Sequence, residues 1–274
     1  MEFRSFNNAA SAYSALVGWG ASQRLPGPIR GPAYRAFARA VGVDLDEAEL
    51  ELREYPTLGD FFARRLRRDA RRIDPASEAI IAPCDGILAA LGHATDGTLV
   101  QAKGKSYRLD ELVADDELAT HLRGGAYATV YLSPRDYHRV HSPVTGRVVG
   151  YDYLPGSLWP VNPRIANRRD NLLARNERVV IRIETPRGPI AVVMVGAIGV
   201  GNIRLTHAED SVLWRHAGER RRIELDVPIE RGDELGAFRL GSTVVMVFAL
   251  SVTRELEGEI GAPVRFGERL GRAA

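Results

Sequence analysis

The sequence predicts an α+β fold, with an N-terminal helical region packed on a mostly antiparallel β-sandwich or barrel core. Before residue 73 the apolar residues recur at helical spacing, whereas from residue 73 onward short apolar runs alternate with Gly, Pro, Asn and Asp. An internal repeat, IIAPCDGILAALG at 80–92 and RVHSPVTGRVVGYD at 139–152, predicts a core of two similar halves. We therefore expect two domains, a helical region at 1–72 and a β core at 73–274.

Several helices are expected in the N-terminal region, where stretches rich in Gly and Pro separate them. The last of them follows Thr57, because Thr57-Leu58-Gly59-Asp60 resembles a capping box. The expected helical segments are 9–18, 33–41, 44–53 and the segment after Thr57.

The helix after Thr57 is expected to be amphipathic. Its apolar face would hold Leu58, Phe61, Phe62 and Leu66, and its other face would carry the six arginines between residues 64 and 72. This basic face is either solvated or a surface that rests on anionic lipid headgroups, aided by exposed apolar residues such as Trp19. Dispersed charge without interleaved aromatic residues argues against nucleic acid as a partner.

Short strands dominate the expected core from residue 73. Strands at this spacing favour antiparallel pairing, and a single helix is expected among them, at 110–122. Besides the two repeat units, the expected strands are 129–132, 179–184, 190–198, 223–227 and 244–252.

The composition is that of a soluble globular protein, with 45% hydrophobic and 26% charged residues and a net charge of +2. No apolar run reaches the roughly 18–20 residues that span a bilayer, and no signal-peptide pattern is present at the N-terminus. Cys84 is the single cysteine, which excludes intramolecular disulfides and thiolate-rich metal sites and fits a reducing cytoplasmic compartment.

Lysine is almost absent from the chain. Lys103 and Lys105 are the only two lysines among 37 basic residues. A catalytic Schiff-base lysine would have to be one of this pair. If amine–carbonyl chemistry occurs here, we therefore do not expect a lysine to take part in it.

The pair Gly241-Ser242 lies where strand is expected on both sides. A glycine inside a strand often marks a close backbone approach. The hydroxyl of Ser242 lies beside the carbonyl of Gly241, which is the arrangement for attack by serine on the preceding peptide bond. The structural alternative is a β-bulge with a hydrogen-bonded serine.

Candidate partners for Ser242 lie in the two halves of the repeat. Asp85 follows Pro83-Cys84 in the first half, and His138 and His141 precede Ser142-Pro143 in the second. Asp85, His141 and Ser242 can form a triad in which the carboxylate orients the imidazole and the imidazole takes the serine proton. The two histidines lack the partners of a zinc site, so no metal is expected.

A series of sequence blocks resembles one known family. The blocks are LVGWGASQR, YPTLGDFFARRLR, APCDG, AKGKSYRLDEL, YLSPRDYHRVHSPVTG, LWPVNP, NLLARNERVV and RGDELGAFRLGST, in that order. In these blocks the chain resembles the pyruvoyl-dependent phosphatidylserine decarboxylase proenzymes of bacteria, over nearly its whole length. The stretch 201–224 fits less clearly, and no role is carried onto it.

The resemblance implies a proenzyme that cleaves itself between Gly241 and Ser242 into a large subunit, 1–241, and a small subunit, 242–274. It implies the triad Asp85, His141 and Ser242, a pyruvoyl cofactor formed from Ser242, and His138 near that cofactor. The pyruvoyl group serves as the electron sink for decarboxylation of phosphatidylserine to phosphatidylethanolamine.

The substrate implied by the resemblance sets the expected surroundings of the enzyme. Because two acyl chains keep phosphatidylserine in the bilayer, the protein is expected to bind peripherally at the cytoplasmic side of the cell membrane. Region 1–72 is its expected contact. An arginine from 164–178 is a chemical candidate for the phosphate partner, and homo-oligomerisation is left open.

Two alternatives remain at the level of the sequence. The pattern S-P-x-x-G-x-V at 142–148 also resembles turns of lipoyl and phosphocarrier domains, in which His138 or His141 would carry a phosphoryl group and Gly241-Ser242 would stay intact. A pyruvoyl decarboxylase of a related phosphoserine lipid is the alternative within the enzyme class. Soluble amino-acid decarboxylases that use pyruvoyl groups lack this set of blocks.

Overall fold

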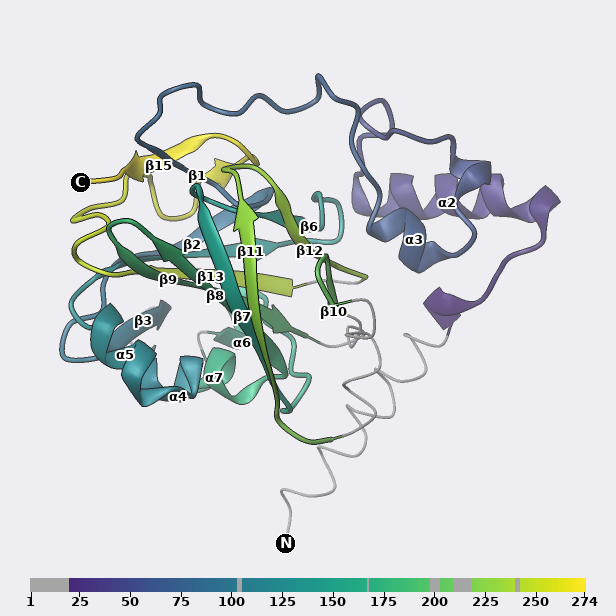
Figure 1. The fold of residues 1–274 in the computed structure, drawn as a ribbon. Helices are drawn as coiled ribbons and strands as arrows, with labels where there is room; N and C mark the ends of the chain where they lie inside the picture. The colour runs from purple at the N-terminus through teal and green to yellow at the C-terminus, as the bar shows by residue number, and fades with distance from the viewer. Residues whose placement is uncertain (1–19, 103–104, 167, 198–202, 209–217, 240–241) are drawn as a thin grey trace, which may run out of the picture.

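The computed structural model describes residues 20–102, 105–166, 168–197, 203–208, 218–239 and 242–274 and has the expected α+β fold (Figure 1). An antiparallel eight-stranded sheet forms its centre. In spatial order the strands are β11 (Arg221–Ile229), β7 (Gly146–Leu154), β8 (Arg178–Thr185), β9 (Gly188–Gly196), β13 (Ser242–Phe248), β5 (Ala126–Leu132), β2 (Gly86–His93) and β14 (Pro263–Val264). The described strands β11 and β14 form its two open edges, so the sheet is not a closed barrel.

Three smaller sheets complete the β structure. β12 (Glu234–Phe238) pairs on one side with β10 (Ile203–Leu205) and on the other with β6 (Arg139–His141). The two-stranded sheets are β1 (Ala79–Ile81) with β15 (Arg269–Arg272), and β3 (Thr98–Ala102) with β4 (Lys105–Arg108).

The position of each strand in the large sheet follows from its sequence. β13, STVVMVF, is buried at every residue and lies between β9 and β5, as expected for a continuous β-branched and apolar run. β11 alternates between more and less exposed residues and lies at an edge. The expected strands at 129–132, 179–184 and 223–227 fall within β5, β8 and β11, and the one at 244–252 ends earlier, at Phe248.

The internal repeat is present in the fold. In each half a short strand, a turn with the pattern Pro-x-x-Gly and a long strand of the large sheet follow one another, as β1–β2 and as β6–β7. The short strands pair outside the large sheet, β1 with β15 and β6 with β12.

The N-terminal helices have a small core of their own. α2 (Gly27–Val41) and α3 (Leu58–Phe62) bury Tyr34, Ala38 and Phe61 together with Tyr55, and the rings of Tyr34 and Phe61 stack at 5.7 Å. Thr57 caps α3, because its hydroxyl oxygen accepts a hydrogen bond from the Asp60 amide at 3.0 Å. Figure 1 shows these helices beside β6, β10 and β12, and a long extended segment leads from them to β1.

Three helix predictions need correction. Residues 44–53 form turns and one 3-10 segment, Leu52–Glu54, because side chains such as Asp44, which accepts from the Asp46 amide, stabilise turns instead. α3 ends at Phe62, so the arginines of 64–72 do not share one helix face. The helix expected at 110–122 is two helices, α4 (Leu109–Val113) and α5 (Asp116–Leu122), separated by Ala114 in the left-handed region.

Two short helices, α6 (Pro163–Ala166) and α7 (Leu172–Arg175), were not expected from the sequence. The expected helix at 9–18 lies outside the described residues, as does Trp19. No helix among the residues described here is long and apolar enough to cross a bilayer.

Candidate active site

The chain changes sheets at the predicted cleavage site. β12 belongs to the three-stranded sheet and β13 to the eight-stranded one, and Gly241 lies outside the described residues between them. Ser242 is the first residue of β13, where it pairs with Leu132 of β5 and Gly196 of β9. Strand flanks the Gly-Ser pair on both sides, as expected, but the two strands are not continuous.

The hydroxyl of Ser242 is buried at the start of β13. The residue is 0% exposed, and among the described residues its Oγ has no hydrogen-bond partner. An unpaired buried hydroxyl costs about 1–3 kcal/mol, so native structures retain few of them.

His138 is a neutral imidazole whose two nitrogens have different surroundings. Its Nδ1 donates to the carbonyl oxygen of Asp136 at 2.8 Å, which leaves the lone pair on Nε2, since a carbonyl can only accept. Nε2 is buried and has no partner in the described part of the chain. Burial lowers the pKa of His138 to about 3, and the ring packs against Phe62 at 4.0 Å.

His141 is held in the same tautomer by different partners. Its Nδ1 donates to the carbonyl oxygen of Gly232 at 2.8 Å, and its Nε2 accepts from the hydroxyl of Tyr137 at 2.9 Å. The ring stacks on Phe266 at 3.8 Å. Burial lowers the pKa of His141 to about 4, so the imidazole is neutral at physiological pH.

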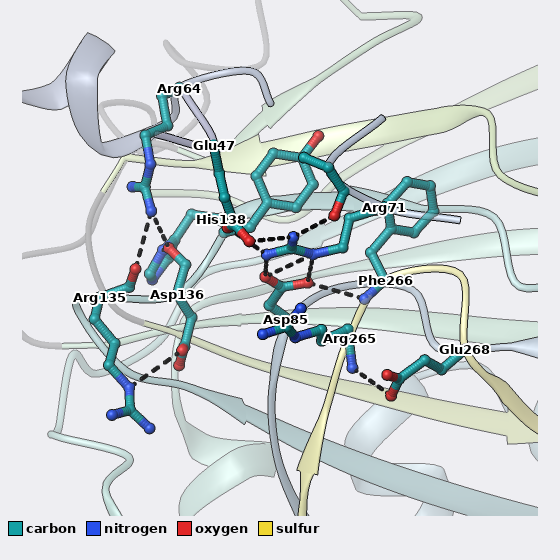
Figure 2. Close-up of polar contacts among 12 residues, drawn as sticks. Glu47, Arg64, Arg71, Asp85, Arg135, Asp136, His138, Arg265, Phe266 and Glu268 are labelled. Carbon is teal, nitrogen blue, oxygen red and sulfur yellow. Dashed lines mark hydrogen bonds and ion pairs between the residues drawn. The ribbon is translucent and has the colours of Figure 1, made fainter. Parts of the chain in front are cut away.

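Asp85 forms the centre of a buried ion network (Figure 2). Its carboxylate accepts from Arg71 Nε at 3.0 Å and Nη2 at 2.5 Å, and from the amide of Phe266 at 2.9 Å. Arg71 in turn binds Glu47 through Nη1 at 2.7 Å and Nη2 at 2.8 Å. Burial opposes the charge on Arg71, but its hydrogen bonds with Asp85 and Glu47 raise its pKa.

Phe266 brings Asp85 and His141 into one cluster. Its amide binds the carboxylate and its ring stacks on the imidazole. The amide of His141 also donates to the carbonyl oxygen of Pro83, close to Asp85 in the chain. No direct hydrogen bond joins Asp85 to His141 among the described residues, because the carbonyl of Gly232 holds the nitrogen that a triad carboxylate would hold.

The topology connects His138 to the region of Ser242. The carbonyl oxygen of His138 accepts from the amide of Phe238, the last residue of β12. Leu132, which pairs with Ser242, begins the loop that leads to His138. No hydrogen bond of the described residues joins Ser242 to either histidine.

Sequence reasoning missed Arg71, Glu47 and Tyr137. Arg71 was one of six arginines assigned to a basic face, and nothing local distinguishes it from its neighbours. It is 8% exposed in its side chain and binds residues 14 and 24 positions away. Tyr137 lies inside the block that supplied both histidines, and that proximity was the available signal.

The remaining reactive residues have structural surroundings. Cys84 is buried, and burial raises the pKa of its thiol well above its usual range. His93 and His121 bind backbone carbonyls at exposed positions. Lys105 pairs with Asp170 at 2.8 Å. In the described ranges, no three His, Cys, Asp or Glu residues gather as a metal site would require.

Comparisons with known proteins identify relatives over nearly the whole chain. The family model described as phosphatidylserine decarboxylase matches residues 58–272. A protein of Myxococcus xanthus is 41% identical over 95% of this chain and 94% of its own, and one of Anaeromyxobacter is 44% identical over 98% and 95%. One of Nitrosococcus oceani is 42% identical over 89% and 82%. All three bear the name phosphatidylserine decarboxylase proenzyme.

Proposed function

This chain belongs to the phosphatidylserine decarboxylase family, and from that premise we propose that it is a proenzyme that cleaves itself between Gly241 and Ser242. The mature enzyme then converts phosphatidylserine to phosphatidylethanolamine and carbon dioxide. The observation that supports this most is the hydroxyl of Ser242, fully buried and unpaired among the described residues at the start of β13. A buried polar group without a partner costs stability, so its presence at the predicted cleavage site calls for an explanation, and self-cleavage provides one.

Cleavage needs only groups of the chain and water. The Oγ of Ser242 loses its proton and attacks the carbonyl carbon of Gly241, so that an ester replaces the peptide bond. Loss of the α-proton of residue 242 then expels Gly241 as a carboxylate and leaves dehydroalanine. Water converts dehydroalanine to a pyruvoyl group with release of ammonia.

His141 is the proposed base for this attack. It is neutral because burial lowers its pKa, and this lowering is opposed by the hydrogen bond to Gly232, by the charge of Glu234 and, to the smallest extent, by the charge of Asp85. Asp85 would therefore assist through its charge, while Gly232 fixes the tautomer. Because the Tyr137 hydroxyl occupies Nε2, the serine proton reaches His141 through that hydroxyl or after its displacement.

The surroundings of Ser242 suit a pyruvoyl group, because a ketone at this position needs no proton donor and lies away from water. The group would supply the electron sink that accepts the electrons of the departing carboxylate. His138 is the proposed proton carrier. Its Nε2, which has no partner among the described residues, can relay to the substrate carbon a proton that the substrate amine releases, because a low pKa makes the protonated imidazole a strong proton donor.

Region 1–72 is the proposed membrane-associating domain. On α2, Ile29 is 53% exposed and Arg35 and Arg39 lie at the surface. Apolar and cationic residues together fit the interface of an anionic bilayer. We propose peripheral binding at the cytoplasmic side of the cell membrane. A triple variant, Ile29→Asp/Arg35→Gln/Arg39→Gln, should bind phosphatidylserine liposomes at least tenfold more weakly than the wild type in a co-sedimentation assay. Equal co-sedimentation of the variant and the wild type would contradict this contact.

The decisive experiment is the intact mass of the purified, denatured protein. We expect two species that divide at Gly241/Ser242, with the smaller one blocked at its N-terminus and reactive toward a carbonyl reagent. A single species of 30.1 kDa that persists on incubation would contradict self-cleavage. Phosphorylation of His138 or His141 would then support a phosphocarrier instead.

Variants of the two histidines test the division of roles. His141→Ala and Ser242→Ala should block cleavage. His138→Ala should be cleaved and then decarboxylate phosphatidylserine about 10²–10⁴-fold more slowly, the usual contribution of positioned proton transfer. An uncleaved His138→Ala protein would overturn this assignment.

A further inference from the structure

A cavity of about 560 Å³ lies between the N-terminal helical region and β12. Its walls come from α3 and the segment after it, from β10 and β12, and from Arg139 at the start of β6. The exposed Leu50 lines it from the helical region, and Arg239, which follows β12 toward Ser242, lines it from the core. The cavity thus extends from the proposed membrane-facing region toward the end of β12.

Arginine dominates the lining of this cavity. Two of the five lining arginines are paired, Arg239 with Asp60 at 2.8 Å and Arg139 with Glu234 at 2.6 Å. The third lining acid, Glu49, is exposed. No ion pair within the described residues neutralises the other three arginines, which are Arg64, Arg65 and Arg204.

Arg64 is the buried member of this set. It is 3% exposed, and its Nη2 donates to the carbonyl oxygens of Arg135 and Asp136 at 2.9 and 3.3 Å (Figure 2). Its Nε and Nη1 are buried and lack a partner among the described residues. A buried guanidinium with unpaired donors is costly, and burial lowers its pKa. An anion that approached it would offset this cost.

The same carbonyl connects Arg64 to the proposed chemistry. Asp136 accepts from Arg64 Nη2 and from His138 Nδ1. An anion held by Arg64 would therefore lie next to the segment that orients His138. The exposed Arg65 and Arg204 would attract the anion at the mouth, and the Arg64 guanidinium, whose Nε and Nη1 are buried in the structure, would turn toward the anion to bind it.

We propose that this arginine cavity, with Arg64 at its inner wall and Arg65 and Arg204 at its mouth, binds the phosphodiester of the lipid headgroup. The proposal rests on the proposed function, since it assigns the phosphate of that substrate to a place in the chain. It orients the headgroup so that the serine moiety points toward His138 and the acyl chains leave past Leu50, at the helical surface.

Two arginines of 164–178, Arg169 and Arg178, are less suited to this role. The guanidinium of Arg178 donates hydrogen bonds to the carbonyl oxygens of Leu112, Glu111 and Asn176, at 2.6–3.0 Å. Arg169 covers the ring of Trp159 at 3.4 Å. Arg64 is therefore a better candidate for the phosphate partner than either of these two.

The test uses the full-length, self-cleaved protein and two variants. Arg65→Gln/Arg204→Gln changes only exposed side chains, so it keeps the test valid if Arg64→Gln fails to fold. Arg187→Gln, an exposed arginine in the β8–β9 turn, is the matched control. The probes are short-chain phosphatidylserine for kinetics, and soluble glycerophosphoserine and inorganic phosphate for calorimetric binding.

We expect the KM of the double variant for short-chain phosphatidylserine to rise about tenfold with kcat and self-cleavage unchanged, since charge-assisted hydrogen bonds would be lost. Arg64→Gln should raise KM about 10- to 100-fold, and Arg187→Gln should match the wild type. Glycerophosphoserine should bind the wild type at least tenfold more tightly than the double variant.

Other outcomes separate this proposal from the proposed function. An unchanged KM in an active double variant would overturn the arginine cavity and leave the decarboxylase standing. Inorganic phosphate that binds as tightly as glycerophosphoserine would show a free-anion site and overturn the headgroup assignment. If the wild type lacked decarboxylase activity, arginine-dependent binding of glycerophosphoserine would still support the cavity, and its absence would overturn it.

Discussion

The two halves of the internal repeat contain the same type of turn, but the residue before the final glycine of the turn differs between them. In the first half Pro83–Gly86 joins β1 to β2, and in the second Pro143–Gly146 joins β6 to β7. Both glycines lie where a side chain does not fit: a Cβ at Gly86 would lie 2.4 Å from the carbonyl oxygen of Tyr131, and one at Gly146 would lie 2.5 Å from that of Glu184. Both turns therefore need glycine for the same steric reason.

The residue before each glycine separates the two turns. Asp85 is 6% exposed and binds Arg71 and the Phe266 amide. Thr145, its counterpart, is exposed and contacts Glu230 at 3.1 Å. Because the fold accepts an exposed threonine at this position, it does not require a buried carboxylate there. The cost of burying Asp85 and Arg71 is therefore consistent with the catalytic role proposed for Asp85, whereas the second turn contains no such buried charge.

Replacement of the two counterparts should give the largest contrast. Asp85→Asn keeps the size of the side chain but removes the charge beside His141, so we expect self-cleavage to slow about 10²–10⁴-fold. Thr145→Val should cleave at the wild-type rate. Cleavage is followed by gel electrophoresis or intact mass after synthesis, and circular dichroism verifies the fold. Equal rates for the two variants would refute the functional difference between the turns.

The glycines should behave alike, in contrast to their neighbours. Gly86→Ala and Gly146→Ala each force a backbone shift, and we expect each to lower the free energy of unfolding by about 3 kcal/mol, as overpacked sites do. Chemical denaturation measures this. Gly20→Ala, at an exposed helical position, is the control, since beyond its chain neighbours a Cβ there meets no atom within 4 Å, and it should change the free energy of unfolding by less than about 1 kcal/mol. A Gly146→Ala protein with the wild-type free energy of unfolding would show that the two turns do not need glycine for the same reason.

The second half should carry the sensitivity to acid. His138 and His141 have folded pKa values of about 3 and 4, below the ordinary value near 6.5, so the unfolded chain binds more protons between these limits. Their contribution to stability is complete above pH 6.5 and decreases as the pH falls toward 4.

At pH 5 each histidine should therefore cost roughly 2 kcal/mol of unfolding free energy relative to pH 7. Denaturation of an uncleaved Ser242→Ala background measures this loss. His141→Gln in that background should reduce the loss by about half. An unfolding free energy that stays constant from pH 7 to 5 would contradict the burial of neutral histidines.

Sequence patterns predicted the local features of the two halves, which are their strands and turns. Runs such as STVVMVF predicted the strands, and the repeat predicted both turns, because periodicity and turn residues act within a few positions. The change of sheet between β12 and β13 could not be predicted from the sequence, since an apolar run has the same pattern in either sheet. The failed helix at 44–53 contains Glu47, whose position depends on the distant Arg71.

Residue types in the sequence suggested the candidate site, but they did not predict its hydrogen bonds. Asp85, His138, His141 and Ser242 came from chemistry and resemblance. The partners that set their states are far away in the chain: Gly232 lies 91 residues from His141, and Phe266 lies 181 residues from Asp85. Such pairings follow from the packing of whole sheets, which no local pattern encodes.

The smallest effect is expected for Glu47, which tests whether the functional contribution of Asp85 extends through Arg71 to the N-terminal region. Glu47 lies in the N-terminal region and binds Arg71, and this hydrogen bond lowers the pKa of Glu47. Because its side chain is 23% exposed and Asp85 remains to pair with Arg71, Glu47→Gln should cost only about 1 kcal/mol of unfolding free energy. Self-cleavage, followed by intact mass, should slow by a few-fold at most.

The matched variant is Glu230→Gln, because Glu230 contacts the counterpart residue Thr145 at the surface. It should leave both stability and cleavage unchanged, since exposed contacts of this kind contribute little. If Glu47→Gln slowed cleavage as much as Asp85→Asn, the whole Glu47–Arg71–Asp85 network would be required for cleavage. The N-terminal region would then contribute directly to the chemistry. If the two glutamate variants were indistinguishable, the difference between the turns would end at Arg71.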